Sequence, residues 1–74
     1  NQIAVKLHTK PGDEIIIEER GHIFNYELGA PAAFSGVMIR PVRSRNENGM
    51  LTWDEIQTAL RVAQAYYTAP TGLV

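Results

Sequence analysis

Cysteine is absent from the 74-residue sequence, and its absence excludes several kinds of chemistry. No disulfide can stabilise the chain, and no thiolate is available to bind zinc or to attack a substrate. Long apolar runs are absent as well, since no stretch approaches the roughly 18 apolar residues of a membrane-spanning helix. We therefore expect no membrane as a partner.

An excess of charge of one sign is also missing, because seven lysines and arginines stand against eight aspartates and glutamates. This balance does not favour binding to nucleic acid. Arg40, Arg43 and Arg45 form a small basic cluster, but no aromatic residues are interleaved with them. Such a cluster is too small for a nucleic-acid surface, so we expect no nucleic acid as a partner.

Several signature motifs are missing too. The chain has no glycine-rich phosphate loop, no GxSxG element and no Ser-His-Asp spacing. His8 and His22 do not have the helical or hairpin spacing that would build a metal site with a carboxylate, so we expect none. His8 is most simply a solvated residue near the end of a helix.

The length of the chain and the character of its two ends indicate an incomplete α/β unit. A chain this short buries only about 60% of its unfolded surface and would be marginally stable alone. It begins at Asn1 without an initiator methionine and ends in the apolar run Thr71–Val74, so both ends resemble the interior of secondary-structure elements. We expect a segment of a larger protein.

Helices and strands are predicted to alternate along the chain. The β-branched run Ile15–Ile17 is typical of a parallel strand that is buried on both faces. Thr52 and Glu55 form a capping box that predicts a helix start. The predicted elements are a helix end at 3–8, a strand at 15–17, a helical stretch at 22–28 resumed at 32–34 and ended at 35–36, a strand at 37–39 closed by Arg40–Val42, an exposed loop at 43–49, a helix with the apolar stripe Trp53, Ile56, Ala59, Leu60 and Ala63, and a strand start at 72–74.

This alternation predicts an α/β fold with a parallel sheet, in which ligands bind beyond the carboxyl ends of the strands. That position selects Glu18–His22 and Arg40–Val42. His22 stands where a strand turns into a helix, and the dipole there favours neutral imidazole, which can stack on a flat ring or accept a proton. From local features alone, a surface or capping histidine is the simpler interpretation.

Other candidates have structural interpretations. Glu18 and Glu19 are consecutive strand residues that point to opposite faces, so they cannot easily share one site as a paired acid and base. We interpret them as a solvated strand end. Tyr66 and Tyr67, near the end of the last helix, are expected to pack rather than to bind a ligand.

Two long runs carry a resemblance to a known family. Pro11–Ile16 and Glu19–Ala33, the latter reading ERGHIFNYELGAPAA, resemble the threonine aldolase family. The later runs Ser35–Val37 with Ile39–Pro41, Gly49–Thr52 and Thr71–Val74 agree with it. The resemblance extends over nearly all 74 residues, and His22–Ala33 is its most specific part.

The resemblance implies a fragment of the large domain of the PLP-dependent transferase-like fold (fold type I), with residues 1–74 as a partial cofactor-binding domain. It implies pyridoxal 5'-phosphate (PLP) as the cofactor and cleavage of threonine- or allo-threonine-type β-hydroxy-α-amino acids to glycine and an aldehyde. His22 corresponds to the catalytic histidine that stacks on the cofactor ring, and Asn1 to the cofactor-binding residue after a phosphate loop. Tyr26 and Glu27 correspond to the substrate pocket, Glu27 in a supporting role. An amino-acid substrate, a homo-oligomer and a cytoplasmic location are further implications.

The chain also departs from the family. Ala69–Gly72 stands where members usually carry an Arg-Thr-Arg-like element, so one arginine facing the cofactor or substrate is absent or supplied elsewhere. The Schiff-base lysine of the family follows a much later strand, so neither Lys6 nor Lys10 is a candidate, and the fragment alone is expected to be inactive. The alternative is a small non-catalytic α/β binding or regulatory module derived from the same scaffold.

Overall fold

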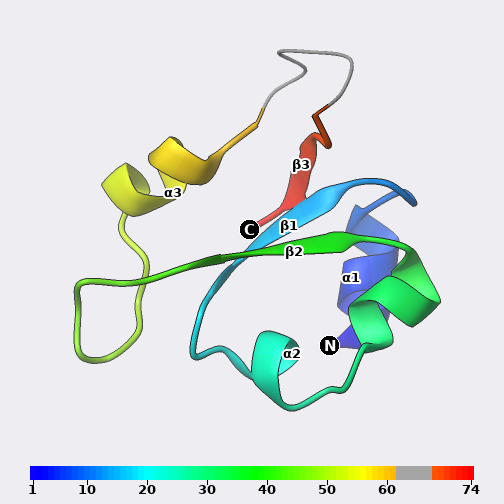
Figure 1. The fold of residues 1–74 in the computed structure, drawn as a ribbon, viewed down its shortest axis with the longest axis horizontal. Coiled ribbons are helices and arrows are strands. Elements are labelled where there is room, and N and C mark those ends of the chain that lie inside the picture. Colours follow the sequence, from blue (N-terminus) through cyan, green and yellow to red (C-terminus); the bar gives the residue numbers. More distant parts are fainter. Residues whose placement is uncertain (62–67) are drawn as a thin grey trace.

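A computed structural model of the chain describes residues 1–61 and 68–74. Its elements alternate as Figure 1 shows. They are α1 (Gln2–His8), β1 (Glu14–Glu18), α2 (His22–Asn25), the π-helical turn η1 (Pro31–Ser35), β2 (Met38–Val42), α3 (Trp53–Ala59) and β3 (Thr71–Leu73).

The strands form one parallel sheet in the order β2-β1-β3, with β1 in the centre. Glu14 is paired with Met38 and Glu18 with Val42, so β1 and β2 run side by side over their whole length. The short strand β3 is paired only with the start of β1. The predicted α/β fold with parallel strands is therefore confirmed, and the carboxyl ends of β1 and β2 lie at the same edge of the sheet.

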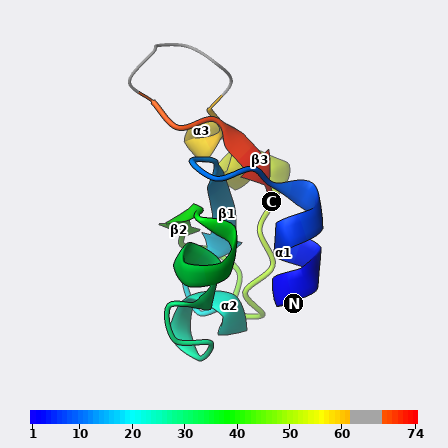
Figure 2. The same ribbon diagram turned by 90° about the vertical axis from the view of Figure 1, so that its right-hand side faces the viewer.

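The apolar core lies between the sheet and α1, which runs beside the sheet in the edge-on view of Figure 2. Val5 of α1, Ile15 of β1 and Val37 form the buried cluster. Three partly buried residues pack against it: Ile23, Ile39 and Leu73. Burial of each of the three fully buried aliphatic side chains stabilises the fold by about 1.5–3 kcal/mol.

The central strand is buried on both faces, as its β-branched run predicts. Ile15 and Ile16 are each 2% exposed although they point to opposite sides of the sheet. The face of Ile16 also carries Glu14, which is buried and accepts a hydrogen bond from Nε of Arg40 at 2.7 Å. One face of β1 is thus apolar, and the other combines an isoleucine with ion-paired carboxylates.

The strand β2 is longer than expected, because Arg40–Val42 belong to it rather than closing it. Proline has no N–H to donate, so it is tolerated in a sheet mainly on an edge strand. Pro41 lies on such a strand, since β2 has only β1 as a neighbour among the strands of residues 1–61 and 68–74. The edge position therefore lets the strand continue through a residue that we expected to end it.

The expected long helix at 22–28 is wrong in its length. α2 ends at Asn25, Tyr26 is its C-cap, and Leu28 has a φ of 57°, which an α-helix does not contain. The chain re-enters helical structure only at η1, which ends at Gly36 with a φ of 65°. The predicted interruption between two helical segments is present, but the first segment ends at Asn25 instead of Leu28.

The capping box at Thr52 is confirmed, because the Thr52 hydroxyl accepts from the amide of Glu55 and the Glu55 carboxylate accepts from the amide of Thr52. The apolar stripe is only partly buried: Ala59 is buried, but Trp53 is 64% exposed. Leu60 lies beyond the helix in extended backbone. The stripe residue Ala63 and the tyrosine pair 66–67 lie outside the described residues.

Candidate functional site

The turn after β1 places His22 at the carboxyl end of the sheet. Gly21 donates its N–H to the Glu18 carbonyl oxygen at 2.8 Å, and α2 begins at the next residue. A Cβ at Gly21 would lie 2.9 Å from that same carbonyl oxygen and 2.9 Å from Cγ1 of Ile17. The turn therefore closes this tightly only because residue 21 has no side chain.

Asn25 holds the start of α2 against this turn. Its side-chain amide donates to the carbonyl oxygens of Glu19 and Gly21, at 2.8 Å and 2.9 Å. These contacts satisfy backbone acceptors that the sharp reversal leaves outside the sheet. The sequence analysis missed this role, because an asparagine within a helical pattern carries no signal of which carbonyl groups it contacts.

The four residues that the resemblance selected, Asn1, His22, Tyr26 and Glu27, lie in one cluster together with Gln2. We call these five residues the His22 cluster. The His22 and Tyr26 rings have centroids 5.5 Å apart and are tilted by 39°. Nδ1 of His22 lies 3.3 Å from Oε2 of Glu27. Residues more than 20 positions apart in sequence therefore meet beside one imidazole.

Glu27 is the centre of this cluster. Nε2 of Gln2 donates to its Oε1 at 3.1 Å, and Nδ2 of Asn1 donates to its Oε2 at 3.1 Å. These hydrogen bonds, the one from Gln2 first, together with the nearby His22, lower the pKa of Glu27 below its ordinary value. The carboxylate is thereby held in its ionised form.

Exposure differs sharply within the cluster. The His22 side chain is 67% exposed and the Glu27 side chain 17% exposed. Tyr26 is also largely exposed. The carboxylate therefore lies on the inner side of the cluster, and the imidazole presents most of its surface outward, where a flat ring or a polar group can contact it.

Sequence reasoning did not single out Gln2. Nothing in the spacing of an amide at the start of α1 indicates that it will meet a carboxylate 25 positions later. The contact arises because the folded chain brings the start of α1 against Glu27 in the bend after α2. Only the assembled fold provides this information.

The expectation of a solvated strand end at Glu18 is wrong. Glu18 is buried, and its carboxylate accepts from Nε and N of Arg20 and from N of Ser44. These hydrogen bonds, led by that of the Arg20 side chain, lower the pKa of Glu18 from 4.5 to about 2. The loop after β2 folds over the end of β1, which removes this carboxylate from water.

Glu19 lies in the turn just after β1, where we expected it to be a strand residue, and it pairs with Arg43 rather than sharing a site with Glu18. The other two members of the basic cluster are also ion-paired, Arg40 with Glu14 and Arg45 with Glu55. The three arginines therefore do not form a patch of free positive charge.

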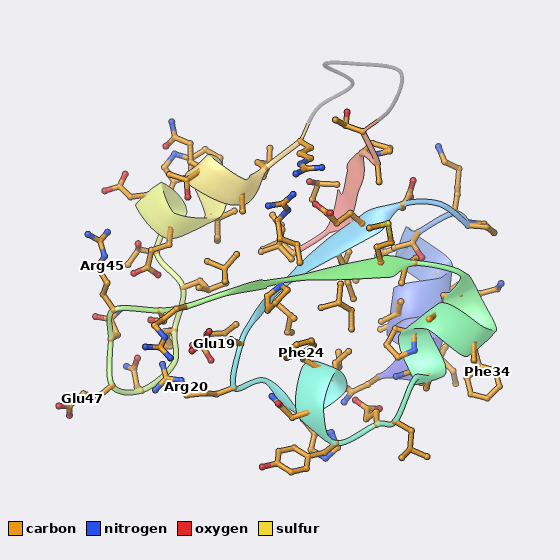
Figure 3. All side chains as sticks on the ribbon, in the orientation of Figure 1. Glu19, Arg20, Phe24, Phe34, Arg45 and Glu47 are labelled. Carbon is orange, nitrogen blue, oxygen red and sulfur yellow. The ribbon has the colours of Figure 1, made fainter. Side chains whose placement is uncertain are left out.

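The loop at 43–49 frames a hollow of about 340 Å³ at the same edge of the sheet. Figure 3 shows Arg20, Arg45 and Glu47 gathered around this loop. The residues that line the hollow are Glu19, Arg20, Arg43, Ser44, Arg45, Asn46 and Glu47. Both positive and negative groups line it, so it has no single charge preference.

Two further expectations concern metals and membranes. In the described part of the chain, no three histidine or acidic side chains gather in a way that could hold a metal ion. His8 is exposed at the end of α1, where we expected a solvated residue. Within residues 1–61 and 68–74, none of the helices has the length and apolar character needed to cross a membrane.

Comparison with known proteins identifies one matching protein family and two similar proteins. The family model described as beta-eliminating lyase matches residues 1–74. The chain is 35% identical over 75 aligned residues, covering all of this chain and 20% of the relative, to a "Probable low-specificity L-threonine aldolase" of Schizosaccharomyces pombe. It is also 29% identical over 69 residues, covering 93% of this chain and 16% of the relative, to an uncharacterized protein of Caenorhabditis elegans. The chain thus spans a fifth or less of the length of these relatives.

Proposed function

Because this chain belongs to the beta-eliminating lyase family, we propose that it is part of a PLP-dependent aldolase. The proposed enzyme cleaves threonine- or allo-threonine-type β-hydroxy-α-amino acids to glycine and an aldehyde. Its likeness to a relative named as a threonine aldolase supports the choice of substrate class. The single observation that carries the proposal is the His22 cluster, which gathers the family-matched side chains around an open imidazole at the carboxyl end of β1.

His22 fits the part that we assign to it toward PLP. Its side chain is 67% exposed, and Oε2 of Glu27 lies 3.3 Å from Nδ1 at the edge of the ring. The Tyr26 ring is tilted by 39° beside it with a centroid 5.5 Å away, so the exposed remainder of the imidazole surface is available for stacking on an aromatic ring. PLP, when bound, supplies an electron sink for the negative charge left on the substrate carbon.

The chain's own residues then have distinct tasks. His22 would lie against the ring of a bound cofactor and would hold or move the proton of the substrate hydroxyl group at an imidazole nitrogen. Asn1 contributes to the cofactor side of the site. Tyr26 lines the substrate pocket, with Glu27 in a supporting role. We also propose that the full-length protein is a homo-oligomer, whereas a cytoplasmic location stays a prediction.

Replacement of His22 by Ala in the full-length protein tests this function. We expect a fall in kcat/KM of about 10²–10⁴-fold, the usual contribution of a general acid or base, and a changed absorption spectrum of the bound cofactor. His8→Ala is the matched control, because His8 is an exposed histidine at the far end of α1. Its rate should stay near that of the wild type.

Two outcomes contradict the proposal. Equal losses in the His22→Ala and His8→Ala variants would remove the case for His22 as the ring partner. A full-length protein that takes up no PLP would support the alternative, a non-catalytic α/β module derived from the same scaffold.

A further inference from the structure

The contacts of Glu27 determine what it can do for its neighbours. An ionised carboxylate accepts hydrogen bonds and donates none. Oε1 already accepts from Gln2, and Oε2 already accepts from Asn1, both at 3.1 Å. Oε2 also lies 3.3 Å from Nδ1 of His22, so Gln2 of α1 and Asn1, the N-cap residue before it, hold the carboxylate in place beside the imidazole.

A neutral imidazole carries its hydrogen on one of two nitrogens, and the partner of each nitrogen selects which one. If Nδ1 carried a lone pair, it would face the negative Oε2 and repel it. If Nδ1 carries the hydrogen, the contact becomes an attraction between N–H and carboxylate. The ring nitrogen nearest Glu27 is therefore the donor, and the lone pair of the neutral ring is at Nε2.

We propose that Glu27 is a positioning residue that holds His22 in the Nδ1-protonated form and leaves Nε2 as its proton acceptor. This inference rests on the proposed function for the identity of the proton that Nε2 receives. It specifies the supporting role of Glu27: the carboxylate acts through His22 and does not take the substrate proton itself.

The burial of the two side chains supports this division of tasks. The Glu27 side chain is 17% exposed and accepts hydrogen bonds from Asn1 and Gln2, whereas the His22 side chain is 67% exposed. A carboxylate that served as the acid or base would need a free oxygen on the open side of the cluster. Both oxygens of Glu27 have donors instead, and the hydrogen bonds that lower its pKa make it a weak proton acceptor.

The first test determines which imidazole nitrogen of His22 carries the hydrogen, in the absence of cofactor and substrate. Full-length protein labelled with nitrogen-15 histidine is examined by NMR at alkaline pH, where imidazole is neutral, and the His22 signals are identified by their loss in His22→Ala. We expect a protonated Nδ1 and an unprotonated Nε2. A wild-type protein with the hydrogen on Nε2 would overturn the inference.

Glu27→Met removes the acceptor and keeps the length of the side chain, and Glu47→Met is its matched control on an exposed loop residue. The nitrogen shifts of His22 should move toward the Nε2-protonated form only in Glu27→Met. Unchanged shifts in that variant would count against the proposed role.

Kinetics of the PLP-loaded full-length protein give the second readout. Glu27→Met should lower kcat by about 10–100-fold, as loss of an orienting partner does elsewhere, with little change in KM. In the His22→Ala background the same substitution should have no further effect, because Glu27 acts through His22.

An additional loss in that double variant, or a rise in KM with unchanged kcat, would assign Glu27 to the substrate and refute the inference. If the wild type cleaves no β-hydroxy-α-amino acid, the proposed function fails. The NMR spectra of the unliganded protein then still decide between the two forms of His22.

Discussion

The glycine before His22 allows a sharp test of how the fold positions the site. The backbone of Gly21 has φ −62° and ψ 149°, which alanine also adopts, so Gly21→Ala creates no conformational strain of its own. The new Cβ would nevertheless meet the Glu18 carbonyl oxygen and Cγ1 of Ile17, both at 2.9 Å. Such a contact is shorter than an ordinary van der Waals separation, so the backbone of the turn must move.

Gly29→Ala is the matched control. A Cβ at Gly29 has no heavy atom within 4 Å, and Gly29 does not have a positive φ. Both substitutions reduce the conformational entropy of the unfolded chain equally, by an amount worth about 0.4–1 kcal/mol. This contribution cancels in the comparison, so only the steric cost at Gly21 remains, and overpacking of this kind costs about 1–3 kcal/mol.

We therefore expect the free energy of unfolding of full-length Gly21→Ala to be about 1–3 kcal/mol below that of Gly29→Ala, measured by urea denaturation. Because His22 is the next residue, the displaced turn should also lower kcat/KM by about 10–100-fold, since a misplacement of 1 Å can cost that much. Equal stabilities and equal rates of the two variants would refute the idea that the missing side chain at residue 21 sets the position of His22.

Two further predictions concern the N-cap of α3 and the buried carboxylate of Glu18 at the end of β1. Thr52→Ala removes half of the capping box and should lower the free energy of unfolding by about 1 kcal/mol in urea denaturation, with the exposed Gln57→Ala as a control near zero. A Thr52→Ala variant as stable as Gln57→Ala would contradict the role of the cap. Arg20 lowers the pKa of Glu18 to about 2, so the stabilising contribution of that carboxylate is fully present above pH 4.5 and is lost as the pH falls toward 2. Glu18→Gln should therefore flatten this acid-dependent part of the stability curve, whereas Glu47→Gln should leave it unchanged; identical curves for the two variants would rule out Glu18 as its source.

Much of the fold could be predicted because its signals are local. The run Ile15–Ile17 indicated a strand buried on both faces, and the capping box at Thr52 indicated a helix start; both are present. Periodicity and capping need only residues within a few positions of each other. The alternation of these elements was enough to predict a parallel sheet.

The errors arose where distant residues decide the outcome. Pro41 was expected to end a strand, yet its place on the edge of the sheet lets β2 continue. Glu18 was expected to be solvated, yet Ser44 and Arg20 enclose its carboxylate. In both cases the prediction used only neighbouring residues, whereas the outcome depends on how distant parts of the chain are arranged around them.

For the candidate site, the sequence alone determined that an imidazole stands where a strand gives way to a helix, because that position depends only on the order of neighbouring residues. The tertiary structure decided which groups surround it. Gln2 and Glu27 are 25 positions apart, and packing of α1 beside the bend after α2 brings them together. The physical reason is that a short segment specifies its own backbone, whereas the partners of a polar side chain are chosen by how the segments pack.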